Sequence, residues 1–100
     1  MNDPKLAARK LSDLVDLARD AASPYEEAAV FAAAVSLYRE FEASADTLDG
    51  YILEKAHEAR WHICAAVGYD ITNDHDKEQH IIWAHGAANG VLRNVEKLGS

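Results

Sequence analysis

The sequence predicts an all-α fold, a compact four-helix bundle-like single domain that spans residues 1–100, and three observations lead to this prediction. The chain has 100 residues, which is the length of one small domain. Its composition, 49% hydrophobic and 27% charged, is that of a globular protein. Apolar residues recur at helical spacing in four segments, without the alternation that marks strands. We therefore expect four antiparallel helices with short connections.

The first expected helix begins at the pair Asp3-Pro4, because aspartate caps a helix and proline fits its first turn. It runs to near Ala22 and has a regular apolar face. The residues of this face are Ala7, Leu11, Leu14, Ala18 and Ala21.

The second expected helix begins after Ser23 in the stretch SPYEEAAVFAAAVSLYREF. Ser23 and Glu26 have the spacing of a capping box, and Glu27 adds negative charge where the helix dipole favours it. These two glutamates are therefore expected to stabilise the start of the helix and not to take part in catalysis. Apolar residues cover so much of this helix that we expect it to be the central one of the four.

The third expected helix begins near Asp46 or Thr47, includes Gly50 in its first turn, and ends at Gly68, which suits a left-handed cap. The stretch GYDITNDHD follows as the longest loop. Asn73 or Asp74 is expected to cap the last helix. The core residues expected in these two helices are Leu48, Ile52, Ala59, Ile63 and Ala66, then Ile81, Ala84, Ala88, Val91, Val95 and Leu98.

No catalytic residues are predicted, and the protein is not expected to be an enzyme or to need a cofactor. The sequence lacks a phosphate-binding glycine loop, a Cys/His zinc spacing and a nucleophile elbow. Its one cysteine, Cys64, lies among apolar residues and is expected to be a buried, inert thiol. The net charge of −7 argues against direct nucleic-acid binding. The absence of a long apolar run and of an apolar core in MNDPKLAARKLSD predicts a soluble, cytoplasmic protein that does not enter a membrane.

Metal binding is the alternative function, because helical bundles can hold metals with Glu-x-x-His pairs. Glu54 and His57 have this spacing, whereas neither His80 nor His85 has a glutamate three residues before it. His85 continues an apolar stripe and is expected to be partly buried. The residues of this alternative metal site are Glu54, His57, Glu58, His62, His80 and His85.

A local concentration of acid predicts a surface that attracts a basic protein partner. Four carboxylates fall within nine residues around the longest loop, with Lys77 as the only base among them. Trp83 and Trp61 lie off the core stripes and could supply apolar contact area. The predicted partner-binding residues are Asp70, Asp74, Asp76, Glu78, Trp83 and Trp61.

Two glycines four residues apart, Gly86 and Gly90, are unusual within the last expected helix, because each costs about 1 kcal/mol relative to alanine. Glycines at this spacing let another backbone approach closely. Either the second helix or a partner is expected to pack there, and a homodimer is compatible with the sequence.

In overall character, a short, acidic, compact helical chain without an active site, the sequence resembles the small phage-encoded inhibitors of bacterial defence of the anti-CRISPR type. This resemblance implies a stoichiometric binder that covers a basic nucleic-acid channel. Separately, the stretch RKLSDLVDLARDAASPYEEAAVFAAAVSLY is similar to a helical-hairpin domain of unknown function in phage and bacterial proteins, which implies no activity. The expected function is therefore that of a non-enzymatic inhibitor or adaptor that binds a basic surface, and the alternative is a metal-binding bundle.

Overall fold

The computed structural model describes residues 3–69 and 75–97, and this part of the chain is all-helical, with no strand. The predicted four-helix, bundle-like fold is confirmed. The elements are α1 (Pro4–Asp20), α2 (Pro24–Ala43), α3 (Gly50–Cys64), a short π-helical segment η1 (Ala65–Tyr69) and α4 (Lys77–Lys97).

The first two helices begin where the sequence predicts, because their caps form. The side chain of Asp3 accepts a hydrogen bond from the backbone N–H of Lys5, and Ser23 Oγ accepts one from the N–H of Glu26 at 3.1 Å. The Glu26 carboxylate accepts from the N–H of Ala22 at 3.3 Å, one residue before the position expected for a capping box. These carboxylate and hydroxyl acceptors satisfy helix-end donors and account for the acidic start of α2.

The starts of the other two helices differ from the predictions. The third helix begins at Gly50, later than the expected Asp46 or Thr47, because Asp49 is its cap and accepts from the N–H of Tyr51 at 2.7 Å. Asp76 Oδ1 accepts from the N–H of Gln79 at 2.9 Å at the start of α4. The expected caps Asn73 and Asp74 lie outside the described residues.

The end of α3 agrees with the prediction of a left-handed glycine. The helix continues into η1, in which Gly68 has a φ of 96°. A side chain at this φ would meet its own backbone, so the position favours glycine.

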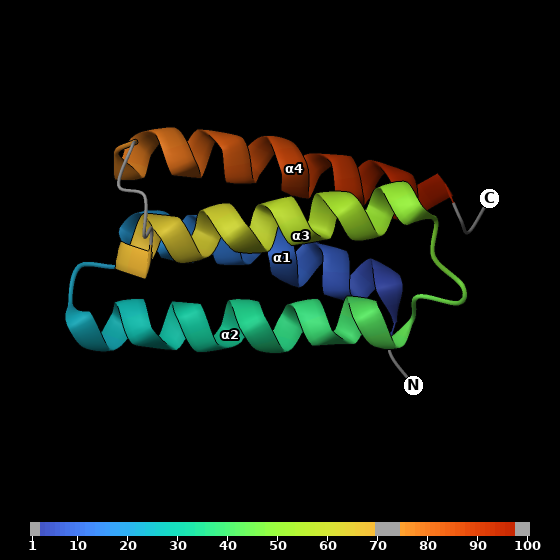
Figure 1. Cartoon of the computed structure of the whole chain (residues 1–100), viewed down its shortest axis with the longest axis horizontal. Coiled ribbons are helices and arrows are strands. Elements are labelled where there is room, and N and C mark those ends of the chain that lie inside the picture. The colour runs from blue at the N-terminus through green and yellow to red at the C-terminus, as the bar shows by residue number, and fades with distance from the viewer. Residues whose placement is uncertain (1–2, 70–74, 98–100) are drawn as a thin grey trace.

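The four helices are arranged with α1 and α3 between α2 and α4 (Figure 1). Across the described residues the backbone of α2 lies beside α1, α3 and η1 but not beside α4. The prediction that α2 is the central helix is therefore wrong. Its wide apolar surface remains partly uncovered, and Tyr25, Ala29 and Ala33 are exposed.

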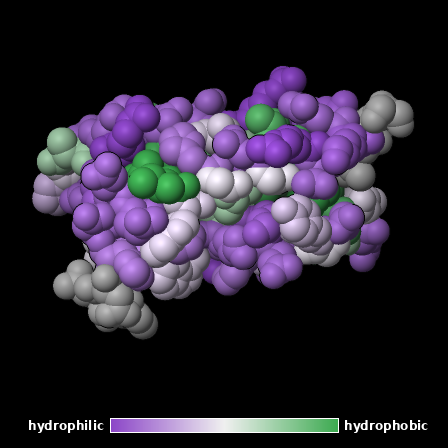
Figure 2. Space-filling view, turned by 90° about the horizontal axis from the view of Figure 1, so that it is seen from above, coloured by the Kyte–Doolittle hydropathy of each residue, from purple (hydrophilic) through white to green (hydrophobic). Residues whose placement is uncertain are grey.

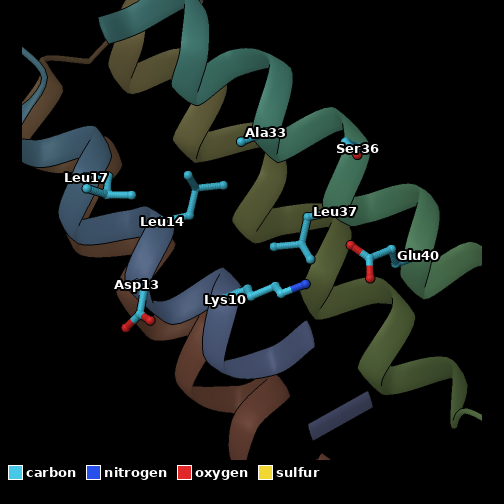
Figure 3. Close-up of a pocket in the computed structure, with 8 residues that line it drawn as sticks. All are labelled: Lys10, Asp13, Leu14, Leu17, Ala33, Ser36, Leu37 and Glu40. Atoms are coloured by element: carbon cyan, nitrogen blue, oxygen red, sulfur yellow. The ribbon is translucent and has the colours of Figure 1, made fainter. Parts of the chain in front are cut away.

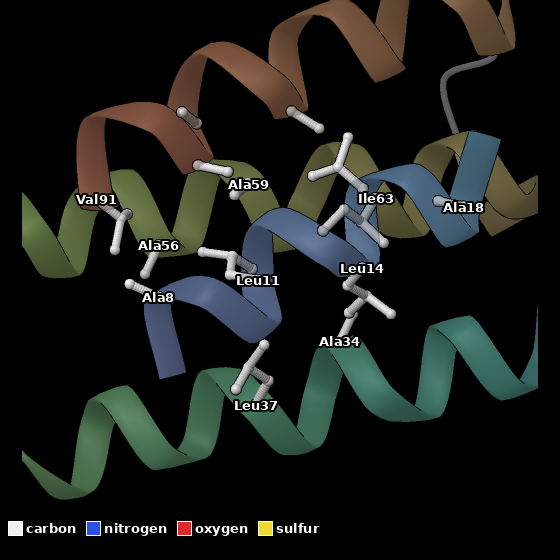
Figure 4. Close-up of a cluster of buried hydrophobic side chains, with 14 of the residues drawn as sticks. Ala8, Leu11, Leu14, Ala18, Ala34, Leu37, Ala56, Ala59, Ile63 and Val91 are labelled. Atoms are coloured by element: carbon white, nitrogen blue, oxygen red, sulfur yellow. The ribbon is translucent and has the colours of Figure 1, made fainter. Parts of the chain in front are cut away.

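The core lies where side chains from all four helices meet (Figure 4). Leu11 and Leu14 of α1 point toward this centre, Leu37 approaches from α2, and Ile63 and Val91 approach from α3 and α4. The apolar faces expected for the first, third and fourth helices are buried wherever the structure describes them, whereas Phe31, Val35 and Tyr38 of α2 are half-buried; Leu98 lies outside the described residues.

The outer surface over α4 is mostly hydrophilic, and its strongly hydrophobic residues lie apart from one another (Figure 2). Among the described helices, none combines the length and the apolar character that crossing a bilayer requires.

Candidate functional site

Five aromatic side chains gather where α3 ends and α4 begins, and we call them the tryptophan–imidazole cluster. They are Trp61, His62, His75, His80 and Trp83. The last turn of α3 supplies the first two and α4 supplies the last two, while His75 precedes α4. Because α3 and α4 pack side by side in opposite directions, the end of one helix meets the start of the other (Figure 1).

A hydrogen bond between two histidines lies at the centre of the cluster. Nδ1 of His62 and Nδ1 of His80 are 3.1 Å apart, so one imidazole donates its N–H to the unprotonated nitrogen of the other. His80 is buried, with 1% of its surface exposed, and His62 is half-buried. The hydrogen bond therefore requires at least one neutral ring at this position.

The indoles flank this histidine pair and remain partly exposed. The ring centroids of Trp61 and His80 are 5.7 Å apart, those of Trp83 and His62 are 5.2 Å apart, and those of Trp83 and His75 are 4.7 Å apart. Exposed fractions of 42% for Trp61 and 39% for Trp83 leave large apolar area in contact with water. On its inner side the cluster is therefore held by the buried ring of His80, and on its outer side the two indoles are accessible to solvent.

The predicted acidic residues are divided between two sides of α4. Asp76 is adjacent to His75 and caps α4. Glu78 lies five residues before Trp83, which places the two about 140° apart around the helix axis. Asp70 and Asp74 lie outside the described residues. The structure therefore brings Trp61 and Trp83 together, but it places Glu78 on a different face.

Glu78 lines a separate hollow of about 580 Å³ between the end of α1 and the start of α4, together with Arg19, Lys77 and His85. The cations of this hollow contact groups of the protein itself. Arg19 pairs with Asp20 at 3.1 Å, and this hydrogen bond lowers the pKa of the exposed Asp20 carboxyl. Lys77 Nζ donates to the carbonyl of Ala21 at 2.8 Å. The Lys77 hydrogen bond joins the start of α4 to the end of α1, whereas the Arg19–Asp20 pair lies within α1.

The residues of the alternative metal site do not converge. Within the described segments, no three His, Cys, Asp or Glu side chains are placed to hold one metal ion. Only His62 and His80 meet, whereas structural zinc sites take four protein ligands and catalytic sites three.

The other four predicted ligands have separate surroundings. Glu54 is exposed. Arg60 Nη2 donates to Nδ1 of His57 at 3.0 Å, and Lys55 pairs with Glu58 at 3.1 Å. His85 is half-buried, as predicted, and its Nε2 lies 3.3 Å from Asp16 Oδ1 of α1.

The two unusual glycines do not provide a close contact for α2. A Cβ added at Gly90 would lie 3.6 Å from Lys55 and Tyr51, both of α3, which is ordinary van der Waals contact. A Cβ at Gly86 would meet nothing within 4 Å. The second helix does not pack there, and both positions have space for a larger side chain than that of glycine.

Cys64 is a free, buried thiol, as the sequence predicts. Burial raises the pKa of this thiol above its usual range, which keeps it protonated at neutral pH. A protonated thiol is a poor nucleophile, so the environment of Cys64 does not activate it.

Sequence reasoning missed the burial of His80 and the participation of His75. A signal for His80 was present, since it precedes Ala84 by four residues and Ala87 by seven, and both are buried. His80 was not predicted to be buried because histidine is polar and is more often a surface residue or a metal ligand. Nothing in the spacing identified His75, whose position depends on how the chain enters α4.

In comparisons with known proteins, no family model, no curated protein and no solved structure matches this chain.

Proposed function

We propose that this chain is a small, acidic, non-enzymatic protein-binding protein, a stoichiometric inhibitor or adaptor, that contacts its partner through the tryptophan–imidazole cluster. One observation carries the proposal: two tryptophans from different helices lie on one face and keep 42% and 39% of their surfaces exposed. Contacts within the protein bury one part of each indole. A partner that covers the exposed part would explain why two large apolar side chains lie at the surface.

Tryptophan suits this role for physical reasons. An indole offers a large apolar area with only two rotatable side-chain bonds, so little conformational entropy is lost when a partner orders it. Here the rings of His62 and His80 already restrain both indoles. Such preorganisation favours binding because part of the ordering cost is met in the free protein.

The charge of the chain supports a partner with a basic surface. The net charge is −7, and Asp76 places an exposed carboxylate directly after His75 of the cluster. Exposed charges act mainly on association, because they steer the encounter over distances comparable to the Debye length. In this proposal the acids increase the association rate, and the indoles slow dissociation.

Association kinetics measured at increasing salt test this division of roles, with a partner first isolated by affinity capture. Asp76→Asn keeps an oxygen acceptor for the α4 cap but removes the charge. We expect this variant to associate more slowly at low salt, to depend less on salt, and to dissociate at the rate of the parent protein. Glu78→Gln provides the matched control on the other side of α4. An association rate that is insensitive both to salt and to Asp76→Asn would contradict steering by this face.

A further inference from the structure

A shallow, largely apolar groove between α1 and α2 does not indicate which ligand would fill it. Figure 3 shows one part of this groove, with Leu14 on α1 facing Leu37 on α2. Lys10, Asp13 and Glu40 bring both signs of charge to its margin, so charge favours no particular partner there. The surroundings of Trp61 in the tryptophan–imidazole cluster are chemically more selective.

The protein holds two of its own cations over aromatic rings. Lys55 Nζ lies 5.5 Å from the centroid of the Tyr51 ring, and Arg60 Cζ lies 4.9 Å from the centroid of the Tyr38 ring. Both distances fall within the roughly 6 Å at which the face of a ring attracts a cation. An indole attracts cations more strongly than a phenol ring does. In the described part of the chain, however, no Lys or Arg lies over either tryptophan.

Trp61 has an exposed ring and a carboxylate one helical turn away. Its exposed fraction is 42%, and its ring makes T-shaped contacts with His62 and His80 at centroid distances of 5.0 and 5.7 Å. A long side chain on a helix covers the turn that precedes its own Cα. The indole is therefore directed toward the turn of Glu58, which lies three residues before Trp61, or about 4.5 Å along the helix axis.

The carboxylate of Glu58 can accept a second cation. Its Oε2 accepts a hydrogen bond from Lys55 Nζ at 3.1 Å, and its side chain is 42% exposed. A carboxylate has two oxygens with about four acceptor positions, so a ligand can bind beside Lys55 without replacing it. An indole face next to such a carboxylate fits a guanidinium group, which stacks on a ring and donates in its own plane to a carboxylate.

The charges around this position favour a cation over an anion. The charged groups of the second half of α3 and of the residue before α4 are three carboxylates and two cations: Glu54, Glu58 and Asp76, with Lys55 and Arg60. Lys55 pairs with Glu58, while Arg60 donates to His57 and lies over Tyr38 of α2. The carboxylates are thus in excess, and the net charge of −7 has the same sign.

We propose that the partner supplies an arginine side chain, whose guanidinium lies over the indole of Trp61 and donates to Glu58. This inference rests on the proposed function and names the chemistry of the contact. Lysine fits this position less well, because its ammonium is more strongly hydrated and cannot stack on a ring. The apolar stem of the arginine would also cover part of the exposed indole.

Nuclear magnetic resonance tests the proposal without the partner, because the chain has two tryptophans and therefore gives two indole N–H signals. Trp61→Phe identifies the Trp61 signal by removing it. The probe is the pentapeptide Gly-Gly-Arg-Gly-Gly with blocked ends, and its control has citrulline, which has nearly the same shape but no charge, in place of arginine. We expect the arginine peptide to shift the Trp61 signal in a saturable manner at millimolar concentration, and the citrulline peptide to bind about fivefold more weakly.

Two glutamate variants separate pairing with Glu58 from general attraction. Glu58→Gln should weaken binding of the arginine peptide roughly threefold. Glu54→Gln is the matched control, because it changes the charge equally but lies about 10 Å from Trp61 along α3 and should change binding less. Circular dichroism checks that both variants remain helical.

Three results would overturn the proposal: a Trp61 signal that does not move, equal binding of the arginine and citrulline peptides, and equal losses in the two glutamate variants. Any of them would leave the proposed contact through the two tryptophans in place, because that contact is tested separately with the whole partner. Loss of the partner contact with a positive peptide result would instead contradict the proposed function and keep Trp61 as an arginine-binding position.

Discussion

At the scale of single residues, glycine occupies two different backbone conformations in this protein. Gly68 has a φ of 96°, in the left-handed region that favours glycine. Gly86 lies within α4, and a Cβ there would meet nothing within 4 Å. The same substitution should therefore have opposite effects at the two positions.

We expect Gly86→Ala to raise the free energy of unfolding by about 0.5 to 1 kcal/mol, because alanine restricts the unfolded chain and fits the helix. Gly68→Ala should lower it by about 1 to 2 kcal/mol, because alanine is strained at positive φ. Urea denaturation followed by circular dichroism measures both. A destabilising Gly86→Ala would show that the helix is not open at this position.

At the scale of helices, caps determine where each helix begins. We expect Ser23→Ala to cost about 0.5 to 2 kcal/mol of stability, because the N–H of Glu26 loses its hydroxyl acceptor. Ser36→Ala, the same change in the middle of α2, should be neutral or slightly stabilising, since alanine has the higher helix propensity. Thermal denaturation compares the two. If Ser23→Ala were as stable as Ser36→Ala, the cap would not stabilise α2.

The number, order and inner faces of the helices could be predicted from the sequence, because the 3.6-residue apolar period of a helix does not depend on how the helices are arranged. The place of α2 could not be predicted. Its apolar surface is wide on every side, and periodicity alone does not tell whether such a helix is central or leaves a face for another molecule. The starts of α3 and α4 were also misplaced, since several Asp, Asn and Thr residues near each start could act as caps and only tertiary packing selects among them.

The candidate site was predictable in part for a similar reason. Trp61 and Trp83 were identified as off-core aromatics, and the structure brings them together. Their shared surroundings depend on the antiparallel contact of α3 with α4, which no local pattern encodes. The acidic residues were grouped by their closeness in sequence, but the turn of α4 separates Glu78 from Trp83.

At the scale of the whole molecule, the structure presents two different surfaces on separate helix pairs. The α3–α4 junction has a restrained aromatic cluster beside Asp76, and the α1–α2 side has a shallow, largely apolar groove. The proposed function needs the first surface alone.

Affinity capture from a lysate of the organism that carries this gene tests the proposed function most directly. Three baits are compared: the parent protein, the double variant Trp61→Ala/Trp83→Ala, and Ile82→Ser as the control. The account predicts that the parent and Ile82→Ser retain the same protein in stoichiometric amount, and that the double tryptophan variant, still helical by circular dichroism, loses it. Equal capture of that protein by all three baits, or its loss from the Ile82→Ser bait alone, would contradict a contact through the tryptophan–imidazole cluster.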